Sequence, residues 1–202
     1  MSSKLNNSLM KKDFLLYANN QTKTIQEDGM ERMGNTLGVD IYTDMFITFF
    51  FYKCGCKTLE EVTEDEYIRG LTAFNCNTLK DVKYRIENTR EILLNIESAE
   101  FRKFYVFLYT FNYIKKLKMI PIDVVEVYFN NLFECFPLTK RLIEYLKNVI
   151  KSQGLTKDQW ECSLDFFINH GSSFPHKYNV DEYYPVLFDD FYRWYLDNSV
   201  NK

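Results

Sequence analysis

The chain reads Leu155-Thr-Lys-Asp158-Gln-Trp160 near its C-terminus, and the same pattern occurs at three earlier places. An aliphatic residue is followed three positions later by an acid, and two positions further by an apolar residue. The other copies read Ile25-Gln-Glu-Asp28-Gly-Met30, Val62-Thr-Glu-Asp65-Glu-Tyr67 and Ile120-Pro-Ile-Asp123-Val-Val125. In chain order, the spacing between the first and second copies is similar to the spacing between the third and fourth. A longer connection separates the two pairs, which indicates an internal repeat.

Each copy has the chemistry of a helix start. Thr63 or Thr156 can cap a first turn, Pro121 fits a first turn, and the acid lies at the positive end of the helix dipole. The aliphatic residue before the cap is then free to pair as a short strand. The repeat predicts an all-α fold of two EF-hand-like helix-loop-helix pairs, packed as one compact unit.

The loops of these pairs lack the residues that bind calcium. A calcium-binding hand needs carboxylates at alternate early positions of its loop, a central Gly and a closing Glu. Lysines stand there instead, as in Lys115-Lys-Leu-Lys-Met119 before Ile120. We therefore expect EF-hand-like pairs without calcium ligands, and no metal or cofactor.

Apolar residues recur at helical spacing over much of the chain. In Thr78 to Ile96 they fall mostly on one face between Lys, Arg and Glu residues. The apolar runs Met45 to Tyr52 and Phe104 to Phe111 are shorter than the ~20 residues that cross a bilayer, so we expect buried helices there. Comparable stripes cover Phe101 to Ile114, Val124 to Phe133, Leu138 to Ile150 and Trp160 to Ile168.

Composition limits the function classes. Phe and Tyr are abundant whereas Gly and Pro are scarce, which suits helices packed on bulky side chains. The net charge of −3 provides no basic field, so we expect no nucleic-acid partner. The segment from Met1 to Lys12 lacks the apolar core of a signal peptide, and the five cysteines are odd in number. We expect reduced thiols, a place in the cytosol or nucleus, and no membrane partner.

Two groups of residues could carry chemistry of their own. Cys54-Gly-Cys56 with Cys76 could bind a metal or supply a nucleophile, although the second ligand pair of a typical zinc site is missing. His170 and His176 could serve a Cys–His relay, but no nucleophile motif accompanies them. We predict buried thiols, loop histidines and no catalytic residues, with a thiol- or histidine-dependent enzyme as an alternative.

The C-terminal quarter is acidic. From Thr156 onward there are eight acids and four basic residues. Such a face beside aromatic residues suits a basic partner, whereas the simpler interpretation is a solvated helix surface.

Several segments resemble the defective-in-cullin-neddylation family. Trp160, Leu164-Asp165-Phe166 and Tyr184-Pro-Val-Leu-Phe-Asp189-Asp190-Phe191 look like the C-terminal signature of that family. The resemblance implies a potentiating-neddylation domain over residues 21–197, with a polar segment and a helix start at 1–20 and a tail at 198–202. Upstream, the likeness continues in Asp28-Gly29, Glu66-Tyr67-Ile-Arg-Gly70-Leu71, Phe101-Arg-Lys-Phe104-Tyr105 and Thr110-Phe-Asn-Tyr-Ile-Lys115.

The resemblance implies a scaffold rather than an enzyme. Members of this family bind the winged-helix end of a cullin with one surface. In an apolar pocket they hold the acetylated N-terminal Met of the neddylation conjugating enzyme. Proximity and orientation then raise the rate of transfer to the cullin lysine. The alternative function is a degenerate EF-hand-like helical adaptor for other protein partners.

The resemblance also implies two sites. The cullin patch of the family is an Asp, an Ala and an Asp, which fall here on Asp158, Tyr183 and Asp189, with Asp190 beside the last. The Tyr183 ring stands where the family has a methyl group, so it can block a close-fitting partner or reach a different one. Apolar residues at helical spacing are more often core than pocket. The acetyl-Met pocket falls on Met30, Phe46, Ile47, Phe50, Leu59, Val62 and Phe111.

Overall fold

The structure, a computed structural model, describes residues 5–41, 43–58, 60–85, 93–180 and 183–199. Helices dominate the described residues, which confirms the predicted all-α class. Contacts within the chain gather into two compact units, Met1–Leu94 and Asn95–Lys202. Each unit is therefore described by itself.

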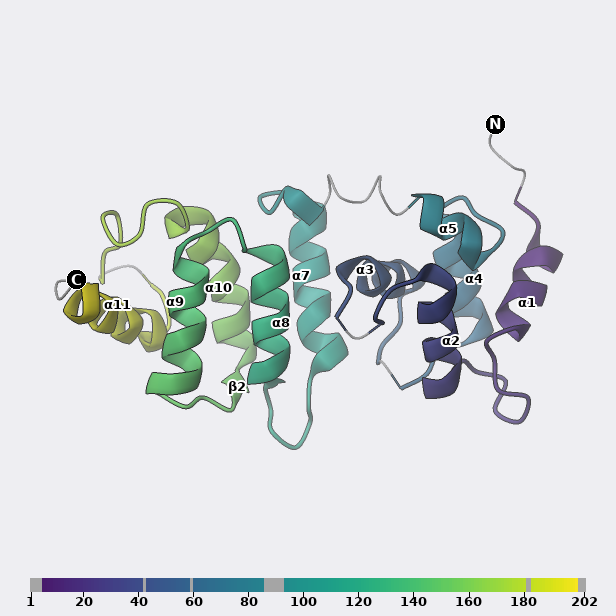
Figure 1. Cartoon of the computed structure of the whole chain (residues 1–202), viewed down its shortest axis with the longest axis horizontal. Helices are drawn as coiled ribbons and strands as arrows, with labels where there is room; N and C mark the ends of the chain where they lie inside the picture. Colours follow the sequence, from purple (N-terminus) through teal and green to yellow (C-terminus); the bar gives the residue numbers. More distant parts are fainter. Residues whose placement is uncertain (1–4, 42, 59, 86–92, 181–182, 200–202) are drawn as a thin grey trace. The chain divides into compact units, whose positions relative to one another are not determined.

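The first unit is a set of short helices with well-formed ends. Asn6 caps the first helix and Asp44 the third, and Thr63 forms a capping box with Glu66 at the start of the fourth. The described helices are α1 (Asn7–Leu15), α2 (Glu27–Leu37), α3 (Met45–Cys54), α4 (Glu64–Ala73) and α5 (Leu79–Arg85) (Figure 1).

The first two copies of the repeat meet in this unit. Ile25 and Val62 form an antiparallel bridge in which each backbone N–H donates to the other's carbonyl, at 2.8 and 2.9 Å. Helices α2 and α4 begin directly after these residues, with Asp28 and Asp65 in their first turns. The predicted pairing of aliphatic residues before two helix starts is thus observed.

The core of the first unit is aromatic, with one buried carboxylate. Phe49, Phe50 and Phe51 of α3 are almost fully buried, as the apolar run predicted. On α1, Oδ2 of Asp13 accepts hydrogen bonds from the Tyr67 hydroxyl at 2.6 Å and from the Leu79 backbone N–H at 2.8 Å. This carboxylate therefore connects three helices that are distant in sequence.

The second unit contains the C-terminal pair of repeats. A π-helical turn, η2 (Tyr145–Val149), extends α9 within the stretch predicted as one helix, Leu138 to Ile150. The other described elements are α7 (Ala99–Asn112), β1 (Ile120–Pro121), α8 (Ile122–Leu132), α9 (Leu138–Glu144), β2 (Gly154–Leu155), α10 (Lys157–His170) and α11 (Val186–Ser199).

Strands β1 and β2 are antiparallel, with Ile120 opposite Leu155 and Pro121 opposite Gly154. We had expected Pro121 in the first turn of α8. It is instead the residue just before that helix. Gly154 is required here because a Cβ would stand 2.1 Å from the Ile120 carbonyl oxygen. The strand pair sets α8 and α10 side by side, each with its repeat acid in the first turn.

Trp160 organises the core of this unit. Its ring is fully buried, stacks on Tyr105 of α7 at 4.3 Å between centroids, and lies 5.7 Å from Phe129 of α8. Its Nε1–H donates to the Tyr105 carbonyl oxygen at 2.9 Å. One side chain thus holds α7, α8 and α10 together.

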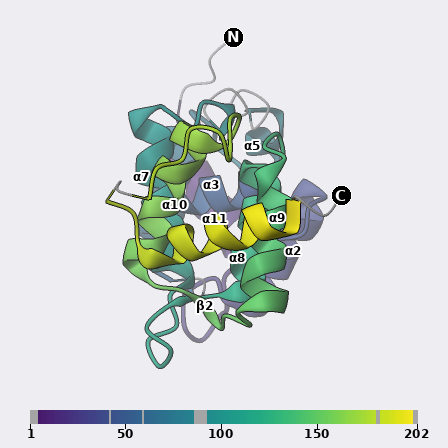
Figure 2. The ribbon, with the colours of Figure 1, turned by 90° about the vertical axis from the view of Figure 1, so that its left-hand side faces the viewer.

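Helix α11 crosses α10 and α9 in the view of Figure 2. Phe166 of α10 packs on Phe188 of α11 at 4.6 Å, and Tyr145 packs on Phe191 at 5.6 Å.

Among the described helices, none combines the length and apolarity that crossing a bilayer requires.

Candidate functional site

Asp158 lies in the first turn of α10. Thr156 and Gln159 form a capping box there, so the helix start is fixed and its backbone N–H groups are partly satisfied. The Asp158 carboxylate is exposed, and the Cys162 thiol one turn later lies 3.9 Å from its Oδ1. Burial and then the Asp158 charge raise the pKa of Cys162, so this cysteine is not an activated thiol.

Asp189 lies in the first turn of α11 and is half-buried. The Tyr178 hydroxyl donates a 2.6 Å hydrogen bond to its Oδ1. Asp190 beside it is exposed and pairs with Arg193 at 3.0 Å on the same helix. Asp189 is thus oriented by a residue from the loop before α11, whereas Asp190 is engaged along the helix surface.

The two patch carboxylates stand on helices that touch each other. Phe166 and Phe188 form the contact, and Asp189 directly follows Phe188. Asp158 precedes Phe166 by about two turns, roughly 12 Å along the helix axis. The structure therefore places Asp158 and Asp189 in one compact unit.

Tyr183 presents its whole side chain to solvent, with an exposed fraction of 106%. Its neighbour Tyr184 is held in place: its hydroxyl accepts from the Asn169 amide at 3.0 Å and its ring lies 5.8 Å from Phe166. Val186, the first residue of α11, is 68% exposed. Tyr183 is thus an exposed aromatic residue beside a fixed neighbour.

The residues predicted for the acetyl-Met pocket are mostly core. Four of them are buried in the first unit, Phe46 is half-buried there, and Leu59 lies outside the described residues. Phe111 belongs to α7 of the second unit, where it stacks on Phe107 at 4.8 Å. The buried four are Met30, Ile47, Phe50 and Val62.

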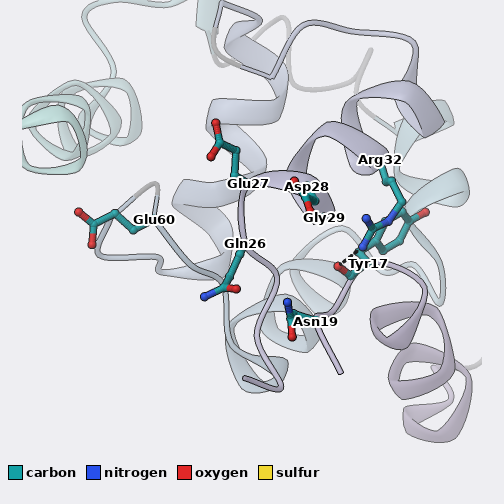
Figure 3. A pocket seen from close by; sticks show the side chains of 8 residues that line it. All are labelled: Tyr17, Asn19, Gln26, Glu27, Asp28, Gly29, Arg32 and Glu60. Carbon is teal, nitrogen blue, oxygen red and sulfur yellow. Dashed lines mark hydrogen bonds between the residues drawn. The ribbon is translucent and has the colours of Figure 1, made fainter. Parts of the chain in front are cut away.

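A separate, polar pocket of about 660 Å³ opens at the start of α2 (Figure 3). Glu27, Asp28 and Glu60 line it together with Arg32, whose Nη2 donates to the Tyr17 carbonyl oxygen at 2.8 Å. Its charged lining does not suit an apolar acetylated Met. Of the residues predicted for that peptide, none that the structure describes lines this pocket.

The residues of the enzyme alternative are not arranged as a catalytic group. Cys54 and Cys76 are buried, and burial raises the pKa of both thiols, the opposite of what an activated nucleophile needs. His170 was predicted to lie in a loop, and this is wrong. It is the last residue of α10 and packs against Phe166 and Tyr178. Among the described residues, no group of three or more His, Cys, Asp or Glu side chains could hold a metal ion.

Comparison with known proteins gives the class of this helical protein. Residues 79–194 match the family model described as cullin binding. The match covers more than half of the chain, so the chain belongs to the cullin-binding family. The resemblance to the defective-in-cullin-neddylation family is thereby confirmed.

Its relatives include DCN1-like proteins of several animals. DCN1-like protein 4 of Drosophila melanogaster is 25% identical over 175 residues, which cover 86% of this chain and 68% of that protein. DCN1-like protein 4 of Homo sapiens is 24% identical over 180 residues, 86% of this chain and 58% of that protein. DCN1-like protein 5 of Rattus norvegicus is 24% identical over 173 residues, which cover 85% of this chain and 71% of that protein.

Proposed function

We propose that this chain is a scaffold-type co-ligase that promotes neddylation of cullins and has no catalytic residues of its own. Membership of the cullin-binding family and the DCN1-like relatives support a role in this pathway. The scaffold acts in the cytosol or nucleus by holding a cullin winged-helix domain close to the conjugating enzyme, which raises the transfer rate through proximity.

One observation carries the cullin half of this proposal. Asp158 and Asp189 occupy the first turns of two helices that pack on each other through Phe166 and Phe188. We propose that both carboxylates meet one basic partner surface. Such charge pairs chiefly set orientation and association rate.

Charge reversal tests this assignment. Asp158→Lys and Asp189→Lys should each weaken binding of a cullin winged-helix fragment by about 2–5 kcal/mol in calorimetric titrations, if the charge pairs become buried on binding. Asp123→Lys is the control, because Asp123 occupies the equivalent first-turn position of α8 and is exposed, as Asp158 is. Equal affinities for all three variants and the wild type refute the patch. Recovery of other proteins but no cullin in a pull-down favours the adaptor alternative.

The conjugating-enzyme half concerns N-terminal acetylation. We propose that the acetylated Met is received by the apolar residues of the first unit, among them Met30, Phe46, Ile47, Phe50 and Val62. A free ammonium there leaves an unpaired charge in an apolar environment, which is costly. The acetylated N-terminal peptide should therefore bind much more tightly than the free-amine peptide, as measured by fluorescence anisotropy. Equal affinities for the two peptides contradict the proposal.

Phe46 offers the least disruptive test of the same pocket, because it is half-buried whereas its neighbours Ile47 and Phe50 are fully buried. Phe46→Ala should weaken binding of the acetylated peptide, whereas the helical circular dichroism signal of the protein should stay unchanged. Unaltered binding by a folded Phe46→Ala protein removes Phe46 from the pocket.

A further inference from the structure

A compact turn joins α7 to β1 in the second unit, and residues 113–119 form what we name the lysine hairpin. Ile114 bridges Met119, its N–H donating to the Met119 carbonyl oxygen at 3.2 Å. The Ile114 carbonyl oxygen accepts from the N–H groups of Leu117 and Lys118 at 3.0 and 2.9 Å. The hairpin projects past the ends of α8 and α10 in both ribbon views (Figures 1 and 2).

The hairpin presents positive charge and apolar side chains to solvent. Lys115, Lys116 and Lys118 are exposed, and Ile114 and Leu117 are 43% and 39% exposed. Within the part of the chain that the structure describes, none of these three ammonium groups takes part in an ion pair. The hairpin is thus a local basic surface on a chain whose net charge is −3.

The hairpin adjoins the start of α10. The antiparallel register that pairs Ile120 with Leu155, extended outward by two positions, brings Lys118 opposite Lys157, the first residue of α10. The Tyr109 hydroxyl donates to the Lys118 carbonyl oxygen at 3.4 Å, and its pKa is raised by burial and lowered by the backbone of Lys157 nearby. Lys157 directly precedes Asp158. The base of the hairpin at Lys118 therefore lies close to the start of α10, where the proposed cullin-binding carboxylate stands.

This edge carries charges of both signs. Lys157 lies only 3.8 Å from Glu161, an exposed pair of little strength, so its charge remains available. A partner that brings only basic groups to Asp158 also brings them toward the lysines, and like charges at an interface are costly. A well-fitting partner therefore carries acidic groups beside the basic group that meets Asp158.

We propose that the lysine hairpin is a second contact of the cullin interface, one that meets an acidic surface of the same winged-helix domain. This inference rests on the proposed function. The hairpin alone is too small for a stable interface of its own, which takes about 800 Å² per partner. Joined to the Asp158 edge it enlarges one interface, and its opposite charge fixes the orientation of the docked partner.

The test uses charge reversal in the hairpin. Lys115→Glu/Lys116→Glu leaves Lys118, which has a positive φ of 54°, untouched, so the turn is kept. Lys103→Glu/Lys140→Glu makes the same change of net charge at exposed positions on α7 and α9. Association rates with a cullin winged-helix fragment are measured for both variants and the wild type by stopped-flow fluorescence at low and high salt.

The hairpin variant should associate about tenfold more slowly than the wild type at low salt, with the difference shrinking at high salt, whereas the control changes by about twofold or less. A faster association of the hairpin variant overturns the inference, because it shows that the partner is basic along the whole edge. Equal rates for the two variants overturn it as well. If the wild type does not bind the fragment at all, the proposed function itself fails.

Discussion

The hydroxyl of Tyr178 donates a 2.6 Å hydrogen bond to Oδ1 of Asp189. Tyr178 lies in the loop before α11, and its ring packs against Phe166 and His170 of α10. Loop, α10 and α11 therefore hold the Asp189 carboxylate in one orientation. A preorganised carboxylate loses less freedom when it binds a partner.

Tyr178→Phe should weaken binding of the cullin winged-helix fragment several-fold, because the substitution removes the hydrogen bond to Asp189 and keeps the ring. A single hydrogen bond contributes about 1 kcal/mol, or roughly fivefold in affinity. Calorimetric titration measures the effect. Tyr128→Phe is the control, since its hydroxyl accepts from Asn112 at 2.7 Å on the α7–α8 side of the same unit. Equal losses in the two variants show that the hydroxyl acts on stability alone.

Tyr183 is the second residue for which we predict an effect on binding. Exposed aromatic residues held by rigid neighbours are frequent anchors at interfaces, and truncating one typically costs more than 1 kcal/mol. Tyr183→Ala should therefore weaken cullin-fragment binding by about tenfold in the same titration. Tyr84→Ala on α5, whose side chain is 82% exposed, should leave the affinity unchanged. Tighter binding by Tyr183→Ala identifies the ring as an obstruction instead.

Asp13 should matter for stability rather than binding. Its carboxylate is 8% exposed and accepts from both Tyr67 and Leu79, so Asp13→Ala leaves two buried donors without their acceptor. Each such loss costs about 1–3 kcal/mol. Urea unfolding followed by far-UV circular dichroism should show a lower midpoint. Asp13→Asn, which can place one amide oxygen at the same point, should lose less; equal losses point to charge rather than hydrogen bonding.

Local signals made much of this fold predictable. The Ile25–Val62 and Ile120–Leu155 pairs follow from a six-residue pattern in which the cap, the dipole and the strand residue are neighbours in sequence. The partner of Asp189 was not predictable in this way. Tyr178 reaches it only through the path of the loop before α11, which no short pattern encodes.

Other features were missed for related reasons. A polar segment and a helix start were predicted for residues 1–20, and α1 occupies Asn7–Leu15; the burial of Met10 and Phe14 was not predicted, because so few apolar residues face inward on that short helix. In the sequence, the hairpin lysines indicate only that the loop before Ile120 lacks calcium ligands. The position of Lys118 near the start of α10 depends on the strand register, which fixes the residues opposite each other across β1 and β2.

Buried tyrosines give the chain a sensitivity to alkaline pH. Tyr105 is fully buried, and this burial raises its pKa well above the ordinary value, with a smaller opposing effect of the Ser163 hydrogen bond. Below about pH 10 the hydroxyl is protonated in both the folded and unfolded states. Above it the unfolded chain loses the proton while the folded chain keeps it. The contribution of this tyrosine to the free energy of unfolding is therefore fully present below about pH 10 and is lost as the pH rises.

Tyr105→Phe should reduce this loss by removing one such hydroxyl. Each tyrosine contributes a slope of at most about 1.4 kcal/mol per pH unit above its unfolded pKa, so the stability of Tyr105→Phe should fall less steeply than that of the wild type. Both tryptophans, Trp160 and Trp194, lie in the second unit, so urea unfolding followed by their fluorescence reports on the Tyr105 environment. Tyr84→Phe, at an exposed position, should keep the wild-type slope. Parallel stability curves for Tyr105→Phe and the wild type above pH 10 contradict the argument, since the lost Ser163 hydrogen bond by itself shifts the curve without changing its slope.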